Sequence, residues 1–186
     1  MRLHSFPTRR SSDLIGVSLF GDGAAAVVAT GADRTALSPN ANRGPRVLAT
    51  RSRVLPATVD VMGWNVGSGG FQLVMTRDVP KMADEYLRDE VDHFLADHGL
   101  SIADISTWVC HPGGPKVLDS IQDAIGLPPE ALVHSRNSMR ENGNISSASV
   151  LDVLRRTVAE PPAEGAFGVM LAMGPGFSFE LLLLQW

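Results

Sequence analysis

Two polar side chains, those of His111 and Asn144, lie where they could act on a substrate. His111 comes near the end of a short apolar run, directly before a glycine-rich turn, and Asn144 lies just before a predicted helix. An Asn amide can donate a hydrogen bond to a developing oxyanion. Both residues also have common structural uses, as a hydrogen-bonded core histidine and as a helix-capping or turn asparagine. The residue types alone leave both interpretations open.

The turn after His111 favours a functional role for it. Gly113 and Gly114 carry no side chains, so a ligand can approach their backbone closely. A helix is predicted to begin near Pro115, and the free N–H groups of its first turn favour anionic groups such as phosphates. The sequence HPGGP therefore combines a candidate catalytic imidazole with a candidate anion site.

Cys110 is the sole cysteine of the sequence and precedes His111 directly. Successive side chains of a strand point to opposite faces, so these two cannot form a nucleophile pair. We interpret Cys110 as a small core residue. The patterns typical of metal sites, dinucleotide sites and phosphate loops are absent, so we predict neither a metal ion nor a bound cofactor.

The elements that must position these residues alternate between strands and helices. Apolar runs predict strands, with a buried one first and a hairpin-like pair last, over 19–30, 46–55, 71–76, 107–112, 167–173 and 177–185. Helical periodicity and its Pro and Gly boundaries predict helices over 81–98, 116–126 and 145–158. Residues 31–45 and the glycine-rich stretch 63–70 are predicted to be loops. This alternation indicates an α/β fold with a mixed sheet.

Composition excludes several classes of protein. The 186 residues suffice for about one domain, and 44% hydrophobic with 19% charged residues is a globular balance. The net charge of −4 disfavours a nucleic-acid partner. One cysteine indicates a reducing compartment, so we expect the cytoplasm. No apolar run reaches the roughly 20 residues of a membrane helix.

Residues 1–14 differ from everything that follows. This segment is basic and polar, lacks the apolar stretch of a secretory signal, and has little of the amphipathic pattern of a transit peptide. The string HSFPTRRSSDL is also what a common sequencing adapter encodes. We therefore interpret 1–14 as an assembly artefact or disordered segment, take 15–186 as the domain, and expect the natural protein to extend upstream of Ile15.

Five separated blocks together resemble one family. They are LFGDGAAAVV, GFQLVMTRDVP, WVCHPGGPKVLD, ENGNISSASVL and GVMLAMGPGFSFELLLL. In order and spacing they are similar to the C-terminal half of type III polyketide synthases, the chalcone synthase-like family. The resemblance runs from about residue 19 to the end, and GWNVGSGG looks more like bacterial members.

The resemblance implies a thiolase-like fold, here the C-terminal αβαβα half with a mixed sheet, and a homodimer in the full-length form. It implies an acyltransferase that condenses an acyl-CoA starter with malonyl-CoA by decarboxylative Claisen chemistry, without a further cofactor. His111 and Asn144 match the family's catalytic His and Asn, whereas its nucleophilic Cys belongs to the other half. We therefore expect this chain to be inactive alone.

Further positions match the substrate-binding residues of the family. Phe20 and Phe71 resemble two gatekeeper phenylalanines, and Ser146 resembles a serine of the cavity wall. The other matching positions lie in the stretch that touches CoA and in the loop of the last hairpin: Gly113, Gly114, Lys116, Met173, Gly174, Pro175 and Gly176. Ala172 and Met173 replace the Gly and Phe that begin this loop in plant enzymes, which leaves product shape open.

Two alternatives remain open. A ketoacyl-carrier-protein synthase of the third type shares the Cys, His and Asn, but its histidine block typically reads HQAN, whereas this chain has HPGGP. A non-catalytic half-length module could instead bind an acyl-CoA or a partner. Such a half domain would expose apolar surface and tend to aggregate.

Overall fold

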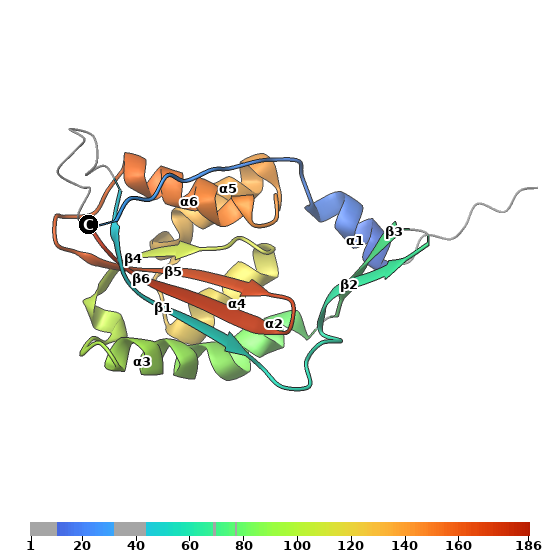
Figure 1. The fold of residues 1–186 in the computed structure, drawn as a ribbon, viewed down its shortest axis with the longest axis horizontal. Coiled ribbons are helices and arrows are strands. Elements are labelled where there is room, and N and C mark those ends of the chain that lie inside the picture. Colours follow the sequence, from blue (N-terminus) through green and yellow to red (C-terminus); the bar gives the residue numbers. More distant parts are fainter. Residues whose placement is uncertain (1–10, 32–43, 69, 77) are drawn as a thin grey trace, which may run out of the picture.

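The computed structural model describes residues 11–31, 44–68, 70–76 and 78–186. Within these residues, a mixed four-stranded sheet carries helices on both faces, and a two-stranded hairpin projects from one end (Figure 1). The predicted α/β class with a mixed sheet is confirmed.

The central sheet has the strand order β1-β6-β5-β4. β4 and β5 run parallel, whereas β6 is antiparallel to both of its neighbours, β1 and β5. Because β4 and β5 are parallel, their carboxyl ends meet at one edge of the sheet. The strands are β1 (Arg46–Val54), β2 (Met62–Gly67), β3 (Gly70–Met75), β4 (Ile105–Cys110), β5 (Phe167–Gly174) and β6 (Ser178–Gln185).

The helices form the outer layers, except for α1, which lies beside the β2–β3 hairpin (Figure 1). One continuous helix runs through three labelled parts, α2, η2 and α3, of which η2 is a π-helical segment. The α-helices are α1 (Ser11–Leu19), α2 (Val79–Met82), α3 (Arg88–Ala96), α4 (Pro115–Ile125), α5 (Val133–Asn142) and α6 (Ala148–Ala159). The remaining helical segments are η2 (Ala83–Leu87), η3 (Ile102–Asp104) and η4 (Pro129–Leu132).

Two apolar clusters hold the helices against the sheet. Since successive side chains of a strand face opposite sides, β5 contributes to both. Val169 and Leu171 pack in the larger cluster with α3 and α4, and Met170 packs with Val150 and Val153 of α6. Burial of each such aliphatic side chain stabilises the fold by about 1.5–3 kcal/mol. The sheet is thereby fixed between the two helical layers.

Most predicted strands are confirmed at their positions. The predictions for 46–55, 71–76, 167–173 and 177–185 match β1, β3, β5 and β6, and β5 and β6 form the expected antiparallel hairpin. The strand predicted over 107–112 is β4, which begins and ends two residues earlier. His111 is therefore the first residue after the strand.

The buried strand predicted over 19–30 is wrong. α1 continues through Leu19, and residues 21–31 have no regular secondary structure and are exposed. A strand needs a hydrogen-bonded neighbour and an apolar surface to cover it. In the described part of the chain, this segment makes only an isolated bridge, between Phe20 and Asn144.

Two further elements were not expected from the sequence. The glycine-rich stretch 63–70, predicted to be a loop, contains nearly all of β2 and the first residue of β3. α5 is a polar helix that buries Ser135 and Ser138, so it lacks the apolar stripe that helix prediction relies on.

The predicted helices are confirmed with shifted ends. Helix 81–98 corresponds to the continuous helix that begins at Val79, and helix 116–126 corresponds to α4. Helix 145–158 begins later, at Ala148. The predicted boundary between residues 14 and 15 lies inside α1 and stays a prediction, while the predicted loop 31–45 lies mostly outside the described residues.

Candidate functional site

His111 is held at the carboxyl end of β4. Its backbone N–H donates to the carbonyl of Leu171 on β5, with an N···O distance of 2.8 Å, and so adds one bond to the parallel ladder. The N–H of Gly113 donates to the His111 carbonyl at 3.0 Å. The chain therefore turns sharply at the point where the imidazole leaves the sheet.

Burial determines the charge of this imidazole. The loss of hydration lowers the pKa of His111 from 6.5 to about 4. At neutral pH the ring is therefore uncharged, with one ring nitrogen as donor and the other as acceptor. Such a ring can donate a hydrogen bond to a carbonyl oxygen that becomes negatively charged.

Asn144 lies in the turn between α5 and α6 and is buried, with an exposed fraction of 4%. Its backbone pairs with the segment that follows α1. The N–H of Asn144 donates to the Leu19 carbonyl at 2.8 Å, and the N–H of Gly21 donates to the Asn144 carbonyl at 3.0 Å. The turn is thus anchored by residues more than one hundred positions earlier in the sequence.

Hydrogen bonds also fix the orientation of the Asn144 amide. Its Oδ1 accepts from the backbone N–H of Ser146 at 2.9 Å and lies 3.5 Å from Oγ of Ser149. Its Nδ2 donates to the carbonyl of Gly113 at 3.0 Å. Because the Ser146 N–H can only donate and the Gly113 carbonyl can only accept, the amide cannot be reversed. Its second Nδ2 hydrogen can serve a bound oxyanion.

Gly113 brings the two candidate catalytic residues together. A Cβ atom placed on Gly113 would lie 3.8 Å from Cδ2 and 3.9 Å from Nε2 of the His111 ring. The carbonyl of the same glycine holds the Asn144 amide. His111 and Asn144 therefore flank one residue, although their catalytic roles stay predictions.

Cys110 is a core residue in the structure. It is fully buried in the larger apolar cluster, and this burial raises the pKa of its thiol. Its carbonyl accepts a hydrogen bond from Oγ of Ser135 on α5 at 2.7 Å. A thiol in this state is unsuited to nucleophilic attack.

The predicted CoA-contacting stretch opens α4. Gly114 is the N-cap residue, Pro115 is the first helical residue, and Lys116 is exposed in the first turn. The helix start and the glycine turn therefore lie directly beyond His111, as the sequence predicts. Contact with CoA stays a prediction.

The other predicted pocket residues are spread over three places. The Phe20 ring lies 6.4 Å from the Trp64 ring on β2, and the side chain of Phe71 lies outside the part of the chain that the structure describes. Ser146 is exposed, with a positive φ of 57°. Its side chain is thus accessible beside Asn144.

The predicted loop of the last hairpin lies at the same sheet edge as His111. Met173 is half-buried against the larger cluster, and Gly174 is the last residue of β5. Pro175 is exposed, and Gly176 has a φ of 138°. Because β4 and β5 are parallel, this turn and His111 follow neighbouring strand ends.

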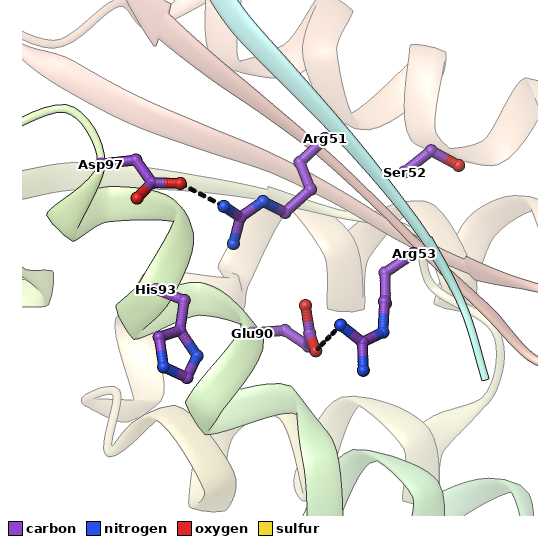
Figure 2. A pocket seen from close by; sticks show the side chains of 6 residues that line it. All are labelled: Arg51, Ser52, Arg53, Glu90, His93 and Asp97. Carbon is purple, nitrogen blue, oxygen red and sulfur yellow. Dashed lines mark hydrogen bonds and ion pairs between the residues drawn. The ribbon is translucent and has the colours of Figure 1, made fainter.

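A depression of about 490 Å³ lies elsewhere, between β1 and α3 (Figure 2). Arg51 points toward Asp97, and Arg53 points toward Glu90 with an N···O distance of 3.6 Å. None of the predicted site residues lines it. The residues around it are Arg51, Ser52, Arg53, Glu90, His93 and Asp97.

Sequence reasoning missed the backbone partners of Asn144. These are Leu19 and Gly21, and the one available signal was the GDG sequence at Gly21 to Gly23. Within residues 11–31, 44–68, 70–76 and 78–186, no group of three or more His, Cys, Asp or Glu side chains could hold a metal ion.

Comparisons with known proteins show the fold and the family of this chain. The α/β architecture is thiolase-like, and solved type III polyketide synthases are its structural neighbours. Residues 46–186 match the family described as chalcone and stilbene synthases, C-terminal domain. The chain belongs to this family, and the resemblance inferred from the five sequence blocks is confirmed.

Named relatives support the same assignment. A 1,3,6,8-tetrahydroxynaphthalene synthase from Streptomyces peucetius subsp. caesius is 46% identical over 179 residues, which cover 94% of this chain and 46% of the relative. A 3,5-dihydroxyphenylacetyl-CoA synthase from Streptomyces toyocaensis is 36% identical over 172 residues, covering 91% and 44%. The chain thus spans about half the length of the curated relatives it matches.

A solved relative shows the likeness in three dimensions. The crystal structure of 1,3,6,8-tetrahydroxynaphthalene synthase from Streptomyces coelicolor A3(2), a bacterial type III polyketide synthase, has a TM-score of 0.73 and 33% identity. The match covers 77% of this chain and 41% of that one.

Among the described residues, no helix has both the length and the apolar character needed to cross a membrane.

Proposed function

We propose that this chain is the C-terminal part of a type III polyketide synthase, an acyltransferase that condenses an acyl-CoA starter with malonyl-CoA. The observation that carries the proposal is the arrangement around Gly113, where a neutral imidazole and an amide of fixed orientation flank one glycine. Family membership supports it, and the name of one relative specifies a CoA thioester.

Decarboxylation of the malonyl group is the step for which these residues are suited. The bond between the carboxylate and the methylene carbon breaks, carbon dioxide leaves, and the electron pair moves onto the thioester oxygen as an enolate. Donors from His111 and Asn144 stabilise that oxygen. No electron acceptor is consumed, so the reaction needs no redox cofactor, and we propose none beyond the CoA of the substrates.

The enolate carbon then attacks the starter acyl group, which is held as a thioester on a cysteine, and the thiolate leaves. Cys110 is unsuited to this role because it is buried in the core. We propose that the nucleophile belongs to a part of the protein outside these 186 residues and that the chain alone is inactive in condensation. Sequencing the source DNA across the codon for Ile15 and upstream tests this directly.

A chimera tests the chemistry. Residues 15–186 replace the corresponding half of the Streptomyces peucetius relative, which is 46% identical over the aligned region. We expect the chimera to consume malonyl-CoA and release carbon dioxide. His111→Ala and Asn144→Ala should each lower kcat by about 10²–10³-fold, the effect of losing one oxyanion donor.

His93→Ala is the matched control, because His93 lies at the depression beside α3 and away from Gly113. Its kcat should equal that of the unaltered chimera. Full activity in both the His111→Ala and Asn144→Ala variants would contradict the proposal. Binding of acyl-CoA without turnover by a folded chimera would instead favour a half-length binding module.

The assembly state and the location follow from the same assignment. We propose a homodimer of the full-length protein in the cytoplasm, with acyl-CoA and malonyl-CoA as its small-molecule partners. Family membership supports this, and sedimentation of the full-length protein tests the dimer.

A further inference from the structure

The segment after α1 and the turn that carries Asn144 are joined by two backbone hydrogen bonds. The Gly21 N–H donates to the Asn144 carbonyl, and the Asn144 N–H donates to the Leu19 carbonyl. Phe20 and Asn144 form the parallel bridge between these bonds. The position of the Asn144 backbone is therefore tied to residues 19–21.

The two segments approach too closely for a side chain at Gly21. A Cβ atom there would lie 2.3 Å from the carbonyl oxygen of Asn142, well inside van der Waals contact. That oxygen belongs to backbone at the end of α5, so the contact is relieved only if residues 19–21 and the Asn144 turn move apart, which strains the two hydrogen bonds between them. At Gly23 a Cβ would lie 2.8 Å from Cδ1 and 3.1 Å from Cβ and Cγ2 of Ile145, so its contacts are with a side chain and not with backbone. At Gly31 it would have no heavy atom within 4 Å.

A movement of this turn changes the candidate catalytic amide. Nδ2 of Asn144 reaches the Gly113 carbonyl at 3.0 Å, a normal hydrogen-bond length with little room for displacement. Relief of the contact at Gly21 requires a shift of about 1 Å, because the distance of 2.3 Å must grow to that of an ordinary carbon–oxygen contact, about 3.3 Å. Such a shift would take the amide away from Gly113 and the imidazole beside it.

We propose that Gly21 is a positioning residue, whose missing side chain and backbone N–H hold the Asn144 amide in place for the reaction. The inference rests on the proposed function, because it assigns the amide a role in that reaction. It adds a residue that touches neither the substrate nor the imidazole and acts through the Asn144 turn.

Hydrogen exchange on the 186-residue chain tests the positioning without any activity. Gly21→Ala should speed exchange of the Asn144 backbone N–H at least tenfold and shift the side-chain amide signals of Asn144. The backbone N–H groups that pair β5 with β6 should keep their protection against exchange. Gly31→Ala, the same change in the same segment, should leave all of these signals unchanged.

Gly23→Ala keeps the test decisive if Gly21→Ala unfolds the chain. Because the added methyl group meets the Ile145 side chain and no backbone atom, this variant should fold and show a smaller, local loss of protection at Asn144. The inference is overturned if Gly21→Ala folds with unchanged exchange at Asn144. It is equally overturned if Gly21→Ala unfolds and Gly23→Ala leaves Asn144 unchanged.

Kinetics of the chimera separate this inference from the proposed function. Gly21→Ala should lower kcat for malonyl-CoA decarboxylation about 100-fold, as for a misplacement near 1 Å, with KM changed less than twofold. If Gly21 had only a structural role, a fully folded Gly21→Ala variant would not lose kcat while keeping its KM. An active chimera that keeps full kcat with Gly21→Ala would refute the inference, whereas an inactive unaltered chimera would refute the proposed function instead.

Discussion

At the scale of single residues, burial sets the chemistry of this site more than sequence neighbours do. Cys110 and His111 are adjacent in sequence, yet the Cys110 thiol is buried in the core whereas His111 lies at the end of the sheet. Burial raises the pKa of the thiol and lowers the pKa of the imidazole, so it favours the uncharged form of both. Each shift makes a prediction that the chain alone can test.

The free energy of unfolding should depend on the ionisation of His111. The folded pKa of about 4 lies below the unfolded value of 6.5, so between them the unfolded chain binds more protons and stability falls as the pH falls. Between pH 7.5 and 4.5, protonation of this imidazole in the unfolded chain should lower the free energy of unfolding by about 2–3 kcal/mol. Urea unfolding at both pH values should show a smaller loss for His111→Gln, and an identical loss in the two proteins would contradict the burial argument.

Cys110 should be chemically inert in the folded chain. Its thiol is fully buried and its pKa is raised, so little thiolate is present or accessible at pH 8. We expect reaction with a disulfide reagent such as DTNB to be at least about 100-fold slower than in denaturant. Fast labelling of the native chain would reopen Cys110 as a candidate nucleophile.

At the scale of elements, an ion pair and a hydrogen bond join the two helices that enclose the Asn144 turn. Arg156 on α6 pairs with Glu141 of α5 at an N···O distance of 2.8 Å. Asp152 on α6 accepts from Arg155 and Arg156 and also from Nδ2 of Asn142 at the end of α5. Burial pushes the pKa of Asp152 upward, but the hydrogen bonds from Arg156 and Arg155 outweigh it and hold the value at about 2. The carboxylate therefore couples the end of α5 to α6.

Asp152→Asn should destabilise the chain by about 1–3 kcal/mol, because the largely buried guanidinium of Arg156 then keeps only one charged partner, Glu141. The folded pKa is depressed, so the contribution of Asp152 is present above pH 3.8 and lost as the pH falls toward 2. Denaturant unfolding at pH 7 measures the loss. Asp123→Asn, an exposed change on α4, is the control and should cost less than about 0.5 kcal/mol.

At the scale of the whole molecule, apolar side chains remain exposed on the segment that was expected to be a strand. Val27 and Val28 have exposed fractions of 58% and 92%. Exposed apolar, strand-prone segments are sites of association. The chain should therefore self-associate through this segment.

Replacing Val27 and Val28 together with Ser should weaken that association, because it removes two large, exposed apolar side chains from the segment. Sedimentation velocity over a concentration series measures the change, with an expected increase in the monomer fraction. Val133→Ser, which alters an exposed valine on α5, should have little effect. Equal association of both variants and the unaltered chain would show that the contacts lie elsewhere.

Local sequence signals predicted the elements that carry His111. The apolar run of β4, the proline and glycines that follow, and the helix start at Pro115 lie where the pattern placed them, to within two residues. Alternation likewise predicted β5 and β6 and the mixed sheet. These features depend on neighbours a few residues apart, which is the range over which hydrophobic periodicity and backbone preferences act.

The sequence by itself determined the α/β class, the family and the two candidate catalytic residues. The tertiary structure decided where residues 19–31 lie and that Gly21 contacts the Asn144 turn. It also decided that α5 forms around buried serines. Strand formation over 19–30 requires a partner strand, and the close approach at Gly21 requires a turn more than one hundred residues away. Local periodicity records neither, because both depend on contacts between distant parts of the chain.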